Sequence, residues 1–444
     1  MKNIDSDNHV TGRSIYVDDI PVRVGTLYAC AFGAPIAHGK IKSIDISAAQ
    51  QVAGVVQILG PKDIPGENQI GGIVADEPLL AEHEVHFQGQ PILLVVAESE
   101  AIAHAAAKKI EVDIDPLPVI TDPREAFAKG QILSNSRTFK MGDAANAFNN
   151  CKYIFEGQAE TGGQEHLYIE TQGAYAYPME HGSVRIASST QGPTAVQRTV
   201  ARVLGVPMHK VEVDVTRLGG GFGGKESQMN LFCAVAAIGA KKLGRPVKIR
   251  PDRDQDMTAT GKRHDFVIDY DVAFDEDGRI LALDGDFAAR CGYSADLSGP
   301  VTDRALFHAD NAYFYPHVRL RSYPMKTNTV SNTAFRGFGG PQGVIVAERI
   351  MEEIGFTLGK DPLEIRKLNF YGGEGRDLTP YHQQVNDNIL DRLVGELEDT
   401  SEYQARRQAI LAHNAKGGVI RKGIALTPVK FGISFTATWF NQAG

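Results

Sequence analysis

The chain has 444 residues, of which 43% are hydrophobic and 23% are charged, with a formal net charge of −8 at pH 7. This length predicts two or three domains, and the composition is that of a soluble globular protein. The acidic balance argues against a nucleic-acid partner, and no run approaches the roughly 20 apolar residues of a membrane span. The first ten residues are too polar for a signal peptide.

The cysteines point to a reducing compartment. Four are present, none in a CxxC pair: Cys30, Cys151, Cys233 and Cys291. This usage predicts buried free thiols in a cytoplasmic protein, and it argues against an iron–sulfur cluster within this chain.

A small α/β domain is predicted over residues 1–120. Its expected strands and single helix follow from apolar runs and an alanine-rich stretch, with strands at 26–32, 52–59, 91–97 and 110–114 and a helix at 98–109. The prolines after residue 115 end this pattern. We expect residues 121–150 to be a polar, irregular linker with one short helix at 124–128.

Residues 151–444 predict a larger domain of mixed α+β and α/β character. Strands are expected at 153–158, 173–177, 183–189, 210–218 and 246–249, and a hairpin joins 264–274 to 279–286. Helices are expected at 191–204, 227–243, 344–355, 388–397 and 403–413, with a loop or short helix at 304–313. Strand-like runs at 423–428 and 430–440 end the chain.

A glycine-rich loop at 219–226 joins a predicted strand to a predicted helix. Its sequence is Gly-Gly-Gly-Phe-Gly-Gly-Lys-Glu, and such a loop exposes main-chain N–H groups to a large, often anionic, ligand. It is not a P-loop, because Glu226 stands where magnesium needs Ser or Thr. The GxGxxG match is weak, because the preceding strand is half polar and no acidic residue follows at the right distance. A sharp structural corner stays an alternative.

A second glycine loop at 334–343 repeats Gly-Phe-Gly-Gly and also leads into a predicted helix. Two loops of one design favour two walls of a single ligand site. A chance repeat in a chain with 46 glycines is the alternative.

With both loops in view, the chain resembles the N-terminal part of the molybdenum-binding subunit of the xanthine dehydrogenase family, from about residue 11 to residue 444. The matching motifs agree in order and spacing: 162–166, 189–191, 220–226, 304–308, 334–342 and 431–436. The resemblance implies an a/b hammerhead domain followed by the first half of the molybdopterin-binding domain.

The resemblance also implies roles by position. Those beside the molybdenum–molybdopterin cofactor would be Gln191, Phe222, Gly223 and Arg336, with Gln191, Phe222 and Arg336 in the molybdenum environment. Those around a purine would be Glu226 and Arg304 at its edges, Phe338 and Phe435 on its faces, and Thr436 beside it. From the residues alone, the phenylalanines would be core residues, and the two charges would be solvated or paired with each other.

The implied activity is hydroxylation of hypoxanthine or xanthine with water as the oxygen source, a step of purine catabolism. Aldehyde oxidases of the family typically replace the residues at Glu226 and Arg304, and carbon monoxide dehydrogenases have cysteine at Gly337. A hydroxylase of another N-heterocycle or an aldehyde, and a cofactor-free relic, are the alternatives.

One element of the family pattern is missing. The family's general base is a glutamate in a Gly-Glu-Pro-Pro context, and no Gly-Glu-Pro occurs in the 444 residues. The resemblance therefore implies no catalytic residue in this chain, which is expected to be inactive in isolation. The implied partners are a 2Fe–2S and FAD subunit or domain and the C-terminal half of the molybdenum domain, within an oligomer.

Overall fold

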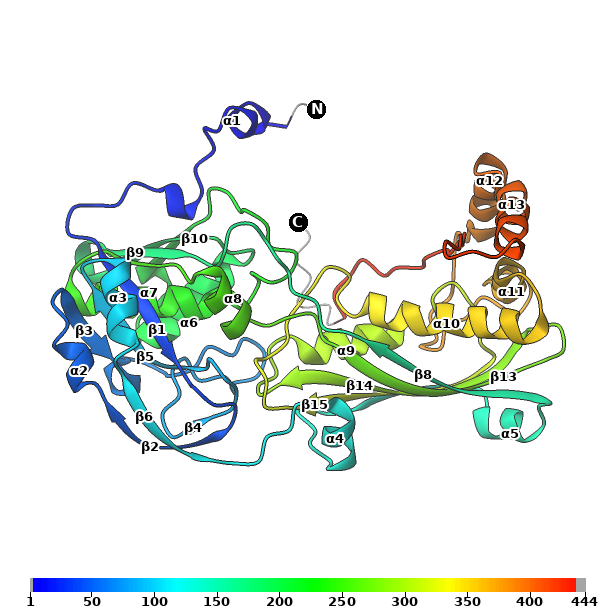
Figure 1. Ribbon diagram of the computed structural model, residues 1–444, viewed down its shortest axis with the longest axis horizontal. Coiled ribbons are helices and arrows are strands. Elements are labelled where there is room, and N and C mark those ends of the chain that lie inside the picture. Colours follow the sequence, from blue (N-terminus) through cyan, green and yellow to red (C-terminus); the bar gives the residue numbers. More distant parts are fainter. Residues whose placement is uncertain (1–2, 437–444) are drawn as a thin grey trace.

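The computed structural model describes residues 3–436. The molecule is elongated, with a seven-stranded sheet at one end and a five-stranded sheet at the other (Figure 1). Its α-helices are α1 (Ser6–Val10), α2 (Ser47–Gln50), α3 (Glu100–Ala107), α4 (Pro123–Ala128), α5 (Ala144–Asn149), α6 (Pro193–Leu204), α7 (Met229–Leu243), α8 (Arg253–Ala259), α9 (Ser298–Phe307), α10 (Gly340–Leu358), α11 (Pro362–Asn369), α12 (Leu390–Thr400) and α13 (Tyr403–Ala415). Within residues 3–436, every helix is too short or too polar to cross a lipid bilayer.

The seven-stranded sheet draws strands from both predicted domains. Its order is β11 (Val211–Asp214), β10 (Val184–Ser188), β9 (Ala174–Pro178), β12 (Val247–Ile249), β1 (Leu27–Gly33), β5 (Pro91–Ala97) and β3 (Val55–Leu59). The junction is a parallel pairing of β1 with β12, in which Leu27 lies opposite Val247. The first 120 residues are thus hydrogen-bonded into the same sheet as strands from residues 174–249.

Both faces of this sheet are covered. Strand β5 is buried along its whole length, and alternate side chains enter different cores because successive residues point to opposite faces. Leu94 and Val96 pack with residues of α6 and α7, whereas Val95 and Ala97 pack with alanines of α3. A three-stranded antiparallel sheet completes the N-terminal region: β4 (Glu84–Val85), β2 (Gly39–Asp45) and β6 (Glu111–Pro116).

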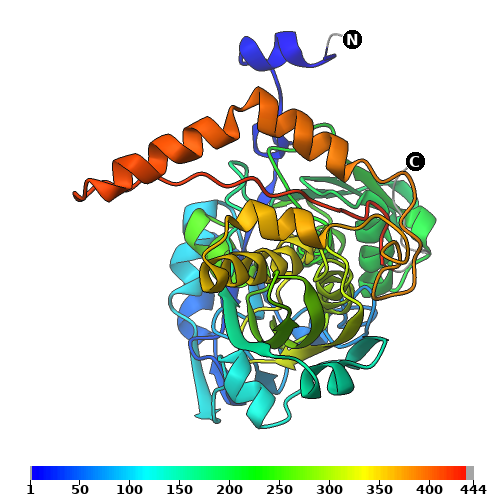
Figure 2. The same cartoon turned by 90° about the vertical axis from the view of Figure 1, so that its right-hand side faces the viewer.

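The five-stranded sheet carries α9 and α10 on one face (Figure 1). Its order is β7 (Arg137–Met141), β15 (His317–Lys326), β14 (Ile280–Gly292), β13 (Phe266–Phe274) and β8 (Tyr153–Thr161). Phe287, Val346 and Ile350 belong to the core between sheet and helices. Helices α12 and α13 lie outside α10 and α11 (Figure 2). Val394 and Tyr403 pack these outer helices onto the core, and Lys367 of α11 pairs with Glu398 of α12.

Most predicted elements are present within one to three residues of their expected ends. The hairpin of β13 and β14 forms, and α6 and α7 end at Gly205 and Gly244, which both adopt left-handed backbone angles. The prediction of an irregular segment at 121–150 is wrong beyond its short helix. It contains α4, β7 and α5, and β7 pairs with β15 while Phe139 packs edge-on against Phe307.

The strands expected at 423–428 and 430–440 are also not found within the described residues, and the expected strand's last residues, 437–440, lie outside them. The segment is extended, but side chains of α9 and the following turn satisfy its main chain. Asn311 accepts from the Lys430 N–H at 3.1 Å, and His308 Nε2 accepts from the Gly432 N–H at 3.1 Å. These main-chain N–H groups are bonded to side chains, so the segment does not need to pair with a neighbouring strand.

Candidate functional site

The first glycine loop folds around one side chain, that of Gln191. Its Oε1 accepts from the Gly223 N–H at 2.9 Å and the Lys225 N–H at 3.2 Å. The Gly219 N–H donates to Glu170, and the Gly224 N–H donates to the carbonyl of Gly221. The expected row of bare N–H groups is therefore wrong for much of the loop, because its own protein already binds these donors.

Lys225 points into the protein and not toward a ligand. Its side chain is fully buried, and Nζ donates to the Glu170 carbonyl at 2.7 Å and the Thr171 carbonyl at 3.3 Å. The Glu170 carboxylate lies 3.4 Å away, while burial lowers the pKa of Lys225 to about 8. Because the Lys225 side chain is buried and bonded to carbonyl groups, it cannot contact a phosphate. Its orientation is a second argument against a P-loop.

The two glycine loops have the same backbone conformation at their Phe-Gly pair, and they touch each other. Phe222 and Phe338 have φ of 52° and 51°, and the next residues, Gly223 and Gly339, have φ of 101° and 97°. The Arg336 N–H donates to the carbonyl of Phe222 at 2.8 Å. Phenylalanine is rarely left-handed, and such strain persists where the surrounding structure fixes it, often at a binding site.

The His166 ring contacts residues of both glycine loops. Its Nε2 lies 2.7 Å from the Ala334 carbonyl, and its ring stacks on Phe335 with centroids 4.5 Å apart. A Cβ on Gly224 would come within 2.7 Å of this ring. The sequence assigned His166 no role, although it ends one of the motifs that carried the resemblance.

Three of the expected cofactor residues surround the fourth, Gly223. Gln191 bonds its N–H, Phe222 precedes it, and Arg336 bonds the adjacent carbonyl. The side chains of Gln191, Phe222 and Arg336 are all exposed, Phe222 by 46%. Three exposed residues, one with an amide, one with an aromatic ring and one with a guanidinium, are thus anchored at one point of the main chain. A cleft of about 650 Å³ opens beside Phe222 and Gly219.

Glu226 lies half-buried near the carboxylate of Asp296. Burial and the nearby charge of Asp296 raise the pKa of Glu226 to about 7. Asp296 is itself buried, and burial raises its pKa too. Burial, with the charge of Asp296, also raises the pKa of Glu77 from the N-terminal region to about 8. Neither Asp296 nor Glu77 was expected, because no local motif marks two carboxylates that are distant in sequence.

Arg304, on α9, is buried and holds the C-terminal extended segment. Its Nη1 donates to the Gly432 carbonyl at 2.5 Å, and its Nη2 donates to the Ser434 carbonyl. Its Nε has no hydrogen-bond partner among the described residues, and burial lowers its pKa. Its guanidinium carbon lies 5.6 Å from the centre of the Phe338 ring.

Phe338 and Phe435 face each other from the second loop and the extended segment. Their ring centroids lie 5.2 Å apart, with the planes at 50°. A planar ring held between them would need a separation of about 7 Å, set by two carbon–carbon contacts. The hydroxyl of Thr436 donates to the Pro300 carbonyl, at the start of α9. The structure therefore gathers Arg304, both phenylalanines and Thr436, with Glu226 on the neighbouring loop.

Comparison with known families gives two matches. The aldehyde oxidase and xanthine dehydrogenase a/b hammerhead domain matches residues 11–118, and the molybdopterin cofactor-binding domain matches residues 127–370. The second match alone covers more than half of the chain. The chain belongs to the xanthine dehydrogenase family.

Individual relatives agree with this family. Xanthine dehydrogenase of Dictyostelium discoideum is 40% identical over 444 residues, and xanthine dehydrogenase 1 of Arabidopsis thaliana is 42% identical over 439 residues. These alignments cover 100% and 98% of this chain but 32% of each relative. The chain thus spans about a third of the length of the curated family members that it matches.

Solved structures confirm the fold, an a/b hammerhead followed by a molybdopterin-binding domain. Aldehyde oxidoreductase from Desulfovibrio gigas superimposes with a TM-score of 0.86 at 29% identity, covering 94% of this chain and 47% of that one. Quinoline 2-oxidoreductase from Pseudomonas putida 86 gives a TM-score of 0.85 at 27% identity, over 94% of this chain and 56% of that one.

Proposed function

We propose that this chain forms the purine pocket and one wall of the molybdenum–molybdopterin site in a xanthine dehydrogenase that hydroxylates hypoxanthine and xanthine. The observation that carries the proposal is the contact of the two glycine loops at Gly223. It joins the exposed residues Gln191, Phe222 and Arg336 through the main chain at Gly223, and Glu226, with a pKa of about 7, follows in the same loop. About 40% identity to xanthine dehydrogenases over the whole chain supports it.

The residues at the loop contact fit the cofactor. Molybdopterin is an anionic, ring-containing group, and a guanidinium, an amide and an aromatic face are groups suited to such a ligand. Gln191, Phe222, the Gly223 main chain and Arg336 would hold it. A side chain at Gly223 would collide with the Ala334 carbonyl, so the close approach of the loops depends on glycine there. When bound, the molybdenum centre would accept the electrons released when water hydroxylates the substrate.

The substrate residues would act by binding, orientation and proton exchange. A glutamate with a pKa near 7 can either accept or donate a hydrogen bond at neutral pH, so Glu226 can match either kind of group on a purine edge. The unpaired Nε of Arg304 is a further donor, while its other nitrogens hold the extended segment. Phe338 and Phe435 supply aromatic faces, and admitting a purine between them requires one ring to move.

The rest of the reaction is assigned to partners. We propose that a general-base glutamate, iron–sulfur and flavin centres lie on further domains or subunits, and that the 444 residues alone do not turn over xanthine. Relatives about three times as long support this proposal. A cytoplasmic location is part of it, supported by four free cysteines.

The test uses the molybdoenzyme assembled with those further domains. We expect stoichiometric molybdenum and turnover of xanthine, and in Glu226→Gln a loss of about 100-fold or more in kcat/KM, because an amide cannot exchange a proton with the ring edge. Glu212→Gln on β11 is the matched control, because its side chain is 56% exposed and pairs with Arg185 on the surface.

Each part of the proposal can fail separately. An assembled enzyme without molybdenum would overturn the cofactor assignment. Intact xanthine turnover in Glu226→Gln, or turnover of an aldehyde or quinoline but not xanthine, would overturn the purine assignment. Turnover of xanthine by the 444-residue chain alone would overturn the division between chain and partners.

A further inference from the structure

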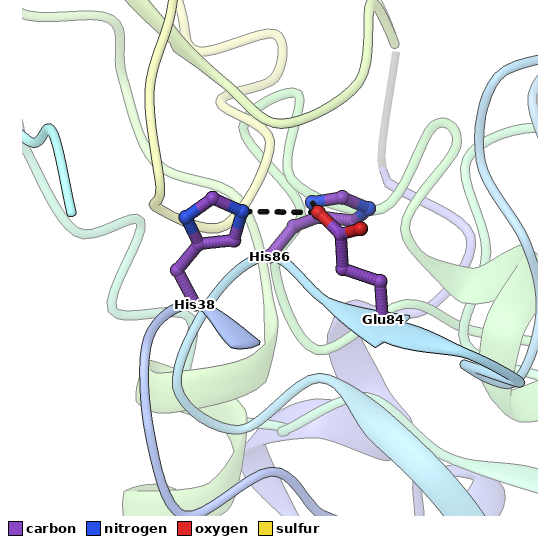
Figure 3. A group of neighbouring side chains, drawn as sticks. All are labelled: His38, Glu84 and His86. Carbon is purple, nitrogen blue, oxygen red and sulfur yellow. Dashed lines mark hydrogen bonds and ion pairs between the residues drawn. The ribbon is translucent and has the colours of Figure 1, made fainter. Parts of the chain in front are cut away.

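Two histidines and a glutamate meet at the ends of two strands of the three-stranded sheet of the hammerhead, and none of them belongs to a glycine loop (Figure 3). The register places them on one face. Strands β2 and β4 are antiparallel with Gly39 opposite Val85, so His38 and His86 continue the same ladder as opposite residues. Glu84 lies two positions before His86 and therefore points to the same side.

The three side chains converge within ligand distance. The nitrogen of each histidine and one oxygen of Glu84 all lie within 4.8 Å of one another. His38 Nε2 is 3.0 Å from Glu84 Oε1, and His86 Nδ1 is 3.6 Å from the same oxygen. Two ligands of a tetrahedral zinc ion stand about 3.3 Å apart, as bond lengths near 2.0–2.1 Å require.

The hydrogen bonds around His38 determine which of its ring nitrogens carries the free lone pair. Its Nδ1 lies 2.6 Å from the Pro118 carbonyl, which can only accept, so the Nδ1 proton is fixed there. In a neutral ring, Nε2 then presents a lone pair to the Glu84 carboxylate. Two acceptors at 3.0 Å repel each other unless a positive species, either a second proton or a metal ion, lies between them.

A carbonyl that orients a histidine by its far nitrogen is the usual outer partner of a metal ligand. The side chains are 19%, 34% and 27% exposed for His38, Glu84 and His86, so an ion can reach them from solvent. Two imidazoles and one carboxylate suit zinc better than calcium or magnesium. We propose that His38, Glu84 and His86 bind a divalent zinc-class cation, with water in the remaining position.

A metal ion at this site would stabilise the contact between the hammerhead and the molybdopterin-binding domain. His86 stacks on Tyr293, which follows β14, with centroids 5.7 Å apart, and the Asn328 amide donates to the His86 carbonyl. The charge of Lys326 also acts on His86 and opposes a cation, so Glu84 is the member that compensates. Removal of Glu84 is therefore expected to weaken binding most.

The test is a titration of the chelator-treated full chain with Zn²⁺ by calorimetry and with Co²⁺ by visible absorption. We expect one strong site, tetrahedral cobalt bands and a thermal midpoint that rises with Zn²⁺. His38→Gln and His86→Gln should each lower the affinity at least tenfold, and Glu84→Gln should lower it further. Circular dichroism checks that each variant stays folded.

His83→Gln is the matched control, because His83 lies three residues from His86 with its side chain 88% exposed. It should bind zinc as the unaltered chain does. Two results would overturn the proposal: no binding at millimolar Zn²⁺, which leaves a protonated His38 paired with Glu84, or binding unchanged in Glu84→Gln and His86→Gln.

Discussion

Lys225 and Glu226 are neighbouring residues of the first glycine loop with opposite charges. Both are shielded from solvent, and the pKa of each shifts toward its neutral form. The Lys225 ammonium finds two carbonyls and a carboxylate, so it is retained as an internal cross-link between loop and chain. Glu226 is half-buried with no cation among the described residues to offset this, and it lies near another carboxylate, Asp296, so both burial and this charge favour its protonated form. Burial disfavours the charged form of both residues, and the neighbour across the fold offsets this for Lys225 and adds to it for Glu226.

Glu226 makes stability depend on pH. Its pKa is about 7 in the folded chain against an ordinary 4.5, so between these values the folded state binds the proton more tightly. Its contribution is full below about pH 4.5 and is lost as the pH rises through 7. Glu226→Gln should thus be more stable than the unaltered chain at pH 8, by at most about 3 kcal/mol, and by less than about 1 kcal/mol at pH 5.

Urea unfolding at pH 5, 6, 7 and 8 measures this difference, and Glu212→Gln serves again as control with a change within about 0.5 kcal/mol at every pH. A stability difference for Glu226→Gln that does not vary with pH would show that the glutamate is ionised throughout.

At the level of elements, the glycine loops act as a pair because their main chains touch. The pair is fixed by the bond from Arg336 to Phe222, by His166 beneath and by Gln191 within the first loop. Other elements use side chains in the same way. The extended segment at 430–436 is held by Arg304, His308 and Asn311, and not by a strand partner.

Gly223→Ala should separate the two loops. The residue has φ of 101°, and a Cβ there would lie 2.6 Å from the Ala334 carbonyl oxygen. Backbone strain and overpacking together should cost about 3 kcal/mol or more of unfolding free energy. Gly244→Ala is the control, since Gly244 has φ of 63° with no atom within 4 Å of its Cβ, and should cost about 1 kcal/mol. If the two variants lose equal unfolding free energy in thermal or urea unfolding, the loop contact can adapt to a side chain at residue 223.

At the scale of the molecule, the hammerhead and the molybdopterin-binding domain are joined by main-chain hydrogen bonds. Strand β1 lies between β5, from the same domain, and β12, from the next one. A junction of this kind transmits unfolding, because loss of β12 leaves β1 with an unpaired edge.

Val247→Ala tests this continuity. Val247 is fully buried on β12 opposite Leu27, and truncating it should cost about 2 kcal/mol. We expect faster amide hydrogen exchange in β1 and β5 as well as in β12. Val272→Ala, equally buried in β13 of the other sheet, should leave exchange in β1 and β5 unchanged. Protection of β1 that survives Val247→Ala would indicate two independently stable domains.

The sequence alone determined features whose cause lies within a few residues. Strand β5 follows from an unbroken apolar run, and the end of α7 follows from Gly244, because periodicity and turn chemistry are local. The family followed from motifs in both loops. The roles assigned to Glu226, Arg304 and the other site residues stay predictions.

Tertiary structure decided what depends on partners far along the chain. Asp296 meets Glu226, His166 meets Ala334, and β1 pairs with β12 about 220 residues away. Strand β7 and the support of segment 430–436 were missed for the same reason, since their partners are β15 and α9. The burial of the Lys225 side chain could not be predicted from the sequence either. A lysine is buried only where carbonyl groups from distant parts of the chain bind its ammonium group.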